Sequence, residues 1–309
     1  MDQDATIIES SNKEALRTYA GERGYQPMLS VWAEMNVVLA GEFRDGNVPA
    51  TMDPLSAAKR SFAALPETVL TYFFRGGSAC RECSLVNRLR DEKRADGPRG
   101  PIGFAISARM SPALHEAIGK LPESAWEPYG KLHPEETREC AEVDFVPGEK
   151  SEKKDTQPLR YIAIRMRNCQ GDLFADGSKV KHFAVATSIN EWKPSRLIEW
   201  HREKAGAIEG VHDVLKNELA AGIVPAKYFG TNAAWLRLAV LTYNLLTALK
   251  RLALPAECLT ARPKRLRFLI FNTPGRLAHR ARSILLRLAT TAERPAMWLE
   301  AFNLLPLRV

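Results

Sequence analysis

One acidic residue lies between two basic residues at regular spacing in the sequence. Arg202, Glu209 and Lys216 are seven residues apart, which is nearly two turns of an α-helix, so the three side chains are expected to share one face. The small residues 205–207 leave space in the turn before Glu209. A carboxylate between two cations suits a metal-binding acid close to phosphate groups. The ordinary alternative is a solvated helix face with incidental charges.

A second feature is a strand whose end carries no side chain. Residues 69–74, VLTYFF, form the short apolar and aromatic run that is typical of a buried strand. The segment RGGS interrupts this run, and Ser78 is expected to cap a helix that extends over about 79–91. Binding groups in α/β proteins are often mounted where a strand ends and a helix begins. At this tip, however, the residue is Gly77.

The elements around these two features predict a mixed α/β core in residues 1–110. Its expected elements are a strand at 5–10, two joined strands at 28–35 and 37–43, a helix from Pro54 to about Leu65, and strands at 68–74 and 102–109. Asp53 is predicted to cap the helix, with Pro54 in its first position.

The remainder of the sequence divides into three further segments. Residues 111–192 are strand-rich and are interpreted as a β-rich insertion, and 193–225 form a long helix after Pro194 that carries Glu209. Residues 226–309 are predicted to be a basic helical region, with helices at about 232–252 and 275–290. The most apolar stretch, 233–254, contains Arg237 and Lys250, so we expect a buried helix and no membrane span.

The positive charge of the sequence is concentrated at its C-terminal end. Of the 309 residues, 250–309 hold twelve Lys or Arg and three acids, a net charge of +9, whereas the whole chain has +8. A neutral body with a basic end suggests a polyanionic partner, although a basic segment can also be a solubilising surface. The string RPKRLRF, with Arg262, Lys264, Arg265 and Arg267, is the strongest candidate for phosphate binding.

Several short blocks resemble the DDE-type transposases of bacterial insertion sequences. Asp4-Ala5-Thr6 is similar to the Asp-x-Thr of the first catalytic aspartate in that family, and Glu209 with Lys216 resembles the signature of its third carboxylate. The blocks GYQPM, EFRDGNVPA and GPIGFAISARMSPALHEAI are also similar to family blocks and occur in the family's order. The resemblance covers nearly the whole chain. It implies an RNase H-like mixed sheet flanked by helices, with a β-rich insertion and a C-terminal helical region.

The resemblance also implies a chemistry, which is the cutting and joining of DNA by phosphoryl transfer with two Mg²⁺ or Mn²⁺ ions about 4 Å apart. Asp4 would bridge the two ions, residue 77 would complete one site, and Glu209 would complete the other. Mg²⁺ prefers such hard oxygen ligands. Arg202 and Lys216 would neutralise phosphates of transposon-end and target DNA.

The sequence departs from the family pattern at the second catalytic acid. The family has Arg-Gly-Asp-Ser where this chain has Arg-Gly-Gly-Ser, so Gly77 takes the place of an aspartate. We therefore expect catalysis to be lower by roughly several powers of ten. Asp45 is the nearest substitute along the sequence, but an aspartate in the turn RDGN is ordinarily a turn former. The main alternative is a catalytically dead DNA-binding remnant or an inhibitor of an intact transposase. A metal-dependent nuclease on the same core is a third reading.

Other expectations concern the setting of the protein. Asp4 lies close to the first residue, so the sequence is expected to be an N-terminally truncated copy that lacks the family's region for end recognition and subunit pairing. DNA is the expected partner, and a homodimer is left open. Five cysteines and no leader-like apolar run favour the reducing cytoplasm.

Overall fold

The computed structural model describes residues 1–131, 135–147, 158–168, 177–281, 283–288, 300 and 303. The chain forms two compact units, of which the first comprises Met1–Gly210 and the second Val211–Val309. In the described part of the chain, no helix combines the length and the apolarity that a membrane span needs.

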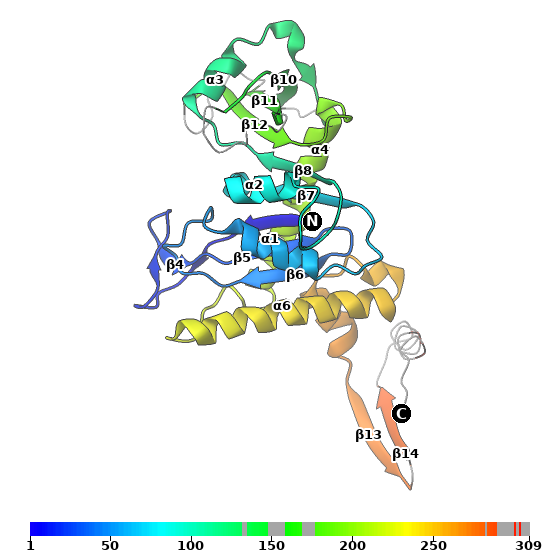
Figure 1. Cartoon of the computed structure of the whole chain (residues 1–309). Coiled ribbons are helices and arrows are strands. Elements are labelled where there is room, and N and C mark those ends of the chain that lie inside the picture. Colours follow the sequence, from blue (N-terminus) through cyan, green and yellow to red (C-terminus); the bar gives the residue numbers. More distant parts are fainter. Residues whose placement is uncertain are drawn as a thin grey trace. The chain divides into compact units, whose positions relative to one another are not determined.

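The first unit is built on a nine-stranded mixed sheet with the strand order β6-β5-β1-β7-β8-β12-β11-β10-β9 (Figure 1). The strands are β1 (Asp2–Ala5), β5 (Met28–Trp32), β6 (Val37–Glu42), β7 (Tyr72–Gly76), β8 (Ile102–Ser107), β9 (Glu127–Pro128), β10 (Glu136–Val143), β11 (Arg160–Asn168) and β12 (Val180–Thr187). The strands β1, β5 and β6 form an antiparallel meander, whereas β7 and β8 run parallel to β1. The chain thus has the large mixed sheet that the resemblance implied.

The strands of the segment predicted as a β-rich insertion continue this sheet. The strand β12 pairs antiparallel with β8, with Ala186 opposite Ile106, and β11, β10 and β9 follow outward. A separate small sheet consists of β2 (Ile8–Glu9), β4 (Arg23–Tyr25) and β3 (Leu16–Arg17).

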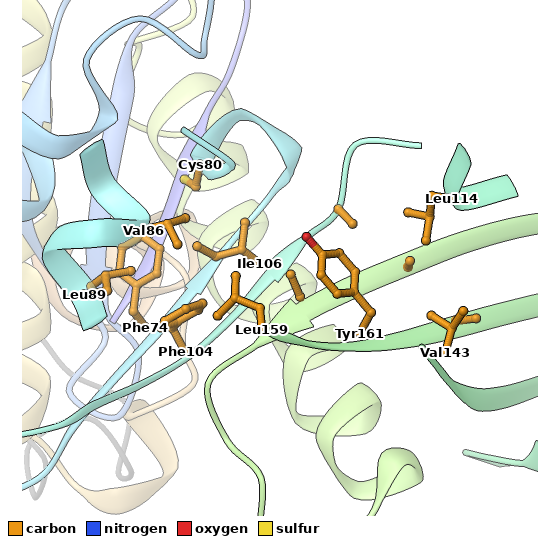
Figure 2. Packing of buried hydrophobic residues seen from close by; sticks show 14 of the residues in the cluster. Phe74, Cys80, Val86, Leu89, Phe104, Ile106, Leu114, Val143, Leu159 and Tyr161 are labelled. Atoms are coloured by element: carbon orange, nitrogen blue, oxygen red, sulfur yellow. The ribbon is translucent and has the colours of Figure 1, made fainter. Parts of the chain in front are cut away.

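The strands have two buried faces, each covered by different helices. Phe104 and Ile106 of β8 pack with Phe74 of β7 and with α2 (Cys83–Arg90), as Figure 2 shows. The residue between them, Ala105, packs instead in the cluster that contains Leu197 of α4 (Pro194–Lys204). This alternation follows from the two-residue period of a strand. Because of this alternation, two side chains that are adjacent along a strand lie on opposite faces of the sheet.

The helices on the first face begin at different signals. In α1 (Pro54–Ala63), the Asp53 side chain accepts a hydrogen bond from the Ser56 amide, as predicted. The helix α2 begins later than predicted, because the Glu82 carboxylate accepts hydrogen bonds from the amides of residues 84 and 85. The expected Ser78 cap is therefore wrong, and Ser78 opens a short 3₁₀ turn that ends at Cys80. A third helix, α3 (Pro112–Gly119), packs in the same cluster through Leu114 and Ile118.

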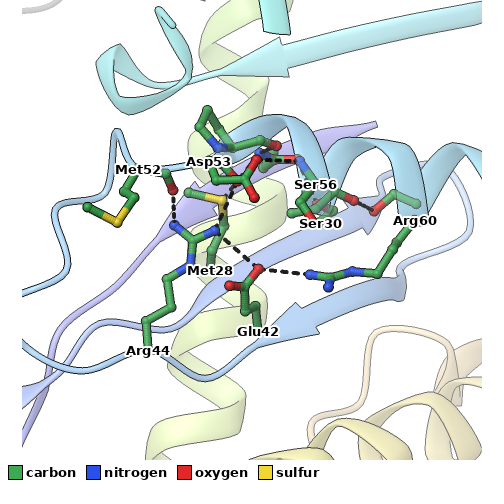
Figure 3. A network of polar contacts seen from close by, with 12 residues as sticks. Met28, Ser30, Glu42, Arg44, Met52, Asp53, Ser56 and Arg60 are labelled. Carbon is green, nitrogen blue, oxygen red and sulfur yellow. Dashed lines mark hydrogen bonds and ion pairs between the residues drawn. The ribbon is translucent and has the colours of Figure 1, made fainter. Parts of the chain in front are cut away.

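A buried arginine fixes the loop between β6 and α1 (Figure 3). The Arg44 guanidinium donates to the carbonyl oxygens of Met52 at 2.6 Å and Asp53 at 3.2 Å, and it pairs with Glu42 at 3.2 Å. Arg60 of α1 pairs with the same Glu42 carboxylate at 2.8 Å. These contacts hold the start of α1 next to the β5–β6 edge of the sheet.

The second unit contains α6 (Phe229–Leu252), α7 (Pro263–Leu266) and a hairpin of β13 (Gly275–Arg280) and β14 (Ser283–Leu288). The helix α5 (Gly210–Asn217) begins at the boundary of the two units. The helix predicted at 232–252 is confirmed as α6, but the helix predicted at 275–290 is wrong. Along β13, Arg276 and Arg280 lie on one side of the strand together with Ala278, and Leu277 and His279 lie on the other, as the two-residue period of a strand requires. Leu277 pairs with Leu286 across the hairpin.

Candidate catalytic site

Asp4 lies on the face of β1 that meets α4. Its neighbour Gln3 points to the opposite face, where Nε2 donates to the carbonyl oxygen of Pro54 at 2.8 Å. Lys204, the last residue of α4, donates from Nζ to Asp4 Oδ2 at 2.8 Å. The other carboxylate oxygen accepts the Ala5 amide at 3.0 Å. Asp4 is thus already neutralised by a protein cation.

Gly77 lies next to this carboxylate. In the parallel pairing of β1 with β7, Gln3 stands opposite Gly76, so Asp4 and Gly77 follow together at the strand tips. A Cβ atom at position 77 would lie 3.3 Å from Asp4 Oδ1. The backbone there has φ −72° and ψ −177°, an extended conformation open to any residue. The structure therefore brings position 77 to Asp4, and the backbone gives no reason for a glycine.

A buried arginine joins the three elements of the site. Arg75 of β7 donates from Nε and Nη2 to the fully buried Asp2 carboxylate at 2.6 and 2.9 Å. Its remaining nitrogen donates to the carbonyl oxygen of Trp200 at 2.5 Å and to Glu203 at 3.1 Å, both in α4. The side chain of Trp200 packs edge-on against Phe73. These contacts fix α4 to the ends of β1 and β7.

His201 adds a second attachment at the tip of β7. Its Nε2 lies 3.2 Å from the carbonyl oxygen of Gly76, and the ring is buried. Burial is the main cause that lowers the pKa of His201 to about 4, and the nearby charges of Lys204 and Arg75 contribute to it. The ring is therefore neutral near pH 7, with Nε2–H as the donor to the carbonyl.

The helix that carries Glu209 is not a continuous α-helix. After Lys204 it passes through a π-helical turn, Ala205–Glu209, before α5 begins. Because a π-helix is bonded from i to i+5, residues five apart lie nearly above one another, whereas in an α-helix they would differ by about 140°. The turn therefore shifts the register of the residues that follow Lys204, and it packs against β1 and β5. The Glu209 side chain is exposed.

The π-helical turn changes the position of the predicted basic partner. The shared face of Arg202 and Glu209 was predicted from the spacing in an uninterrupted α-helix, and the π-helical turn between them removes that basis. Arg202 lies two residues before Lys204, on another side of α4, and donates to the Tyr129 hydroxyl at 2.6 Å. Lys204 could not be predicted as a site residue, since no residue pattern indicates that its side chain reaches Asp4.

These residues do not fit a two-ion metal centre. The Asp4 carboxylate is engaged by Lys204, and Gly77 offers no side-chain oxygen as a ligand. Among the described residues, no group of three or more His, Cys, Asp or Glu could hold a metal ion. Asp45 pairs its backbone with Tyr25 and accepts the Val48 amide at 3.1 Å, as a turn former would, and burial raises its pKa.

The predicted basic residues of the second unit have different surroundings. Lys216 lies in α5. The guanidinium of Arg262 pairs with Asp213 and, at 2.5 Å, with Glu218. Three exposed cations follow it: Lys264, Arg265 and Arg267. On the hairpin, Arg276 stands directly opposite Arg287.

Comparison with known proteins decides the family. A family model described as "Transposase DDE domain group 1" matches residues 1–308. The chain belongs to this transposase family. A search of curated proteins gives no match. Among solved structures, this transposase family member is similar to a chain of the piggyBac transposase synaptic complex with hairpin DNA, with 9% identity and a TM-score of 0.46. That match covers 80% of this chain and 46% of the piggyBac chain.

Proposed function

We propose that this protein is a transposase-like protein that binds DNA and is impaired in cutting and joining it. The family carries the expectation of DNA transposition by metal-dependent phosphoryl transfer with Mg²⁺ or Mn²⁺. The proposed impairment is supported by one observation at the ends of β1 and β7. Asp4 lies next to a glycine there and is paired with Lys204. A water molecule next to Gly77 would supply no negative charge.

DNA binding is supported by the basic second unit. The exposed Lys264, Arg265 and Arg267 lie in a segment without acids, since none occurs between Glu257 and Glu293. The directly opposed Arg276 and Arg287 repel each other across the hairpin unless an anion lies between them. A phosphate backbone supplies such anions. Transposon-end and target DNA are the proposed ligands.

The impairment is tested by measuring how fast three forms of the chain nick DNA in the presence of Mn²⁺. The DNA carries the element's own ends, and the three forms are the native chain, Gly77→Asp and Gly77→Asn. We expect background nicking by the native chain and an increase of roughly 10²-fold or more in Gly77→Asp, because a missing charge-stabilising group is restored. Gly77→Asn is the matched control, since it has the same shape without the charge, and should remain at background. Equal and robust nicking by the native chain and Gly77→Asp would overturn the proposal.

The same preparations separate the rival function. A DNA-binding remnant, or an inhibitor of an intact transposase, would bind DNA in a salt-dependent manner in all three forms and nick in none. The logarithm of the binding constant should fall with the logarithm of salt concentration, and Arg267→Gln should reduce that slope by about 0.9 if Arg267 contacts a phosphate. Arg262→Gln is the comparison, because Arg262 is already paired with two carboxylates. The absence of any salt-dependent binding would contradict both readings.

A further inference from the structure

We propose that Lys204 is the resident counter-ion of Asp4 and competes with divalent cations for its carboxylate. This inference deepens the proposed function, because it concerns the cation that occupies the altered site. Its consequence is that position 77 is one of two determinants of metal binding here. The second is a lysine on the helix that carries Glu209.

The burial of the pair favours a fixed contact. Lys204 is 8% exposed, and the Asp4 side chain is 24% exposed. A buried ammonium is costly unless a charge and hydrogen bonds compensate it. Asp4 Oδ2 at 2.8 Å supplies both, so the lysine has a strong reason to remain on this oxygen.

The attachment of α4 limits where the ammonium can go. One turn before Lys204, His201 contacts the carbonyl oxygen of Gly76, and Arg75 donates to that of Trp200. The base of the Lys204 side chain is thus held at the strand tips, while the π-helical turn follows directly after it. Only the flexible part of the lysine can withdraw from Asp4.

A divalent ion bound to Asp4 would therefore meet a like charge within a few Å. Like charges at such a distance repel strongly even when partly screened by solvent. An aspartate at position 77 would add a ligand, but its Cβ would lie 3.3 Å from Asp4 Oδ1, within reach of the same ammonium. Lys204 would thus oppose metal binding in the Gly77→Asp protein as well.

The test measures Mn²⁺ binding to the full chain without DNA, by titration calorimetry and by the electron paramagnetic resonance signal of free Mn²⁺. In the Gly77→Asp background, we expect Lys204→Met to lower the dissociation constant for Mn²⁺ about tenfold. Lys204→Arg should leave it unchanged, because the charge is kept. Lys193→Met is the matched control, since it removes an exposed cation just before the same helix.

A further variant ties the gain to one carboxylate. Adding Asp4→Asn to Lys204→Met should abolish the tightening. Equal or weaker Mn²⁺ binding in a Lys204→Met protein that melts cooperatively would overturn the proposal, as would a gain that survives Asp4→Asn. If Lys204→Met does not fold, Lys204→Gln retains a donor for Asp4 and gives the same comparison. Because no DNA is present, failure here leaves the nicking result independent.

Discussion

Two rows of residues cross the ends of β1, β7 and α4, and they differ in how many of their positions carry a charged side chain. The first, called the buried row after Asp2 and Arg75, also includes the exposed Glu203. The open row, two residues further along both strands, consists of Asp4, Gly77 and Lys204. The first has a charged group from every element. In the second, the position directly after β7 is Gly77, which has no side chain.

This difference indicates which side chains the folded structure needs. In the buried row, Asp2 is fully buried, so loss of its partner would leave an uncompensated charge in the protein interior. In the open row, Lys204 neutralises Asp4, and the site is partly exposed to water. A glycine at position 77 therefore leaves no unpaired charge behind. The fold can therefore persist without a side chain at this position.

The largest expected effect on stability in either row comes from Arg75→Met. We expect a loss of about 3–5 kcal/mol in the free energy of unfolding, because Asp2 would remain buried without its partner. Urea unfolding followed by tryptophan fluorescence measures this loss. Gly77→Ala is the control in the open row and should change stability by less than about 1 kcal/mol. Similar losses in the two variants would mean that the rows do not differ in structural importance.

A second prediction uses His201, which contacts the residue between the two rows. Its pKa is about 4 in the folded protein, below the ordinary value of 6.5. The unfolded chain therefore binds a proton first as pH falls. The stability that the neutral ring contributes is complete above pH 6.5 and is lost as pH falls towards 4.

The native chain should thus lose as much as about 3 kcal/mol of unfolding free energy between pH 6.5 and 4 through this group. His201→Gln should remove that part of the pH dependence. Urea unfolding at four or five pH values checks it. An unchanged slope in His201→Gln would assign the acid sensitivity to other groups.

The smallest expected effect lies within the buried row itself. Glu203 pairs with Arg75 at 3.1 Å, but its side chain is 69% exposed, so solvent screens the pair. Glu203→Gln should lower the free energy of unfolding by less than about 1 kcal/mol in the same urea assay. A loss close to that of Arg75→Met would show that Glu203, and not Asp2, is the partner on which the row depends.

Local signals in the sequence were sufficient to predict the elements whose position depends on one or two residues. Asp53 and Pro54 fixed the start of α1, and the apolar run before Gly77 located β7 to within a few residues. The start of α2 was missed because Glu82, a less usual cap than Ser78, supplies the acceptor.

The rest of the candidate site depends on features that sequence patterns do not carry. The shared face of Arg202 and Glu209 was predicted with the seven-residue spacing of an α-helix. The π-helical turn between them interrupts that register. Lys204 became visible only through the packing of α4 on the strand tips. The hairpin β13–β14 was predicted as a helix because its leucines and arginines suit both periods. Pairing between the strands decided between them.

The ordinary backbone angles at Gly77 have a genetic consequence. Since φ −72° and ψ −177° suit aspartate as well as glycine, the backbone needs no change to accept the acid, and only the Asp4 carboxylate, 3.3 Å from the new Cβ atom, has to shift slightly. The glycine codons GGT and GGC become aspartate codons by one base substitution. A gene with either codon at position 77 is therefore a single point mutation from encoding an aspartate there, and natural variation at that codon is where such a variant would be found.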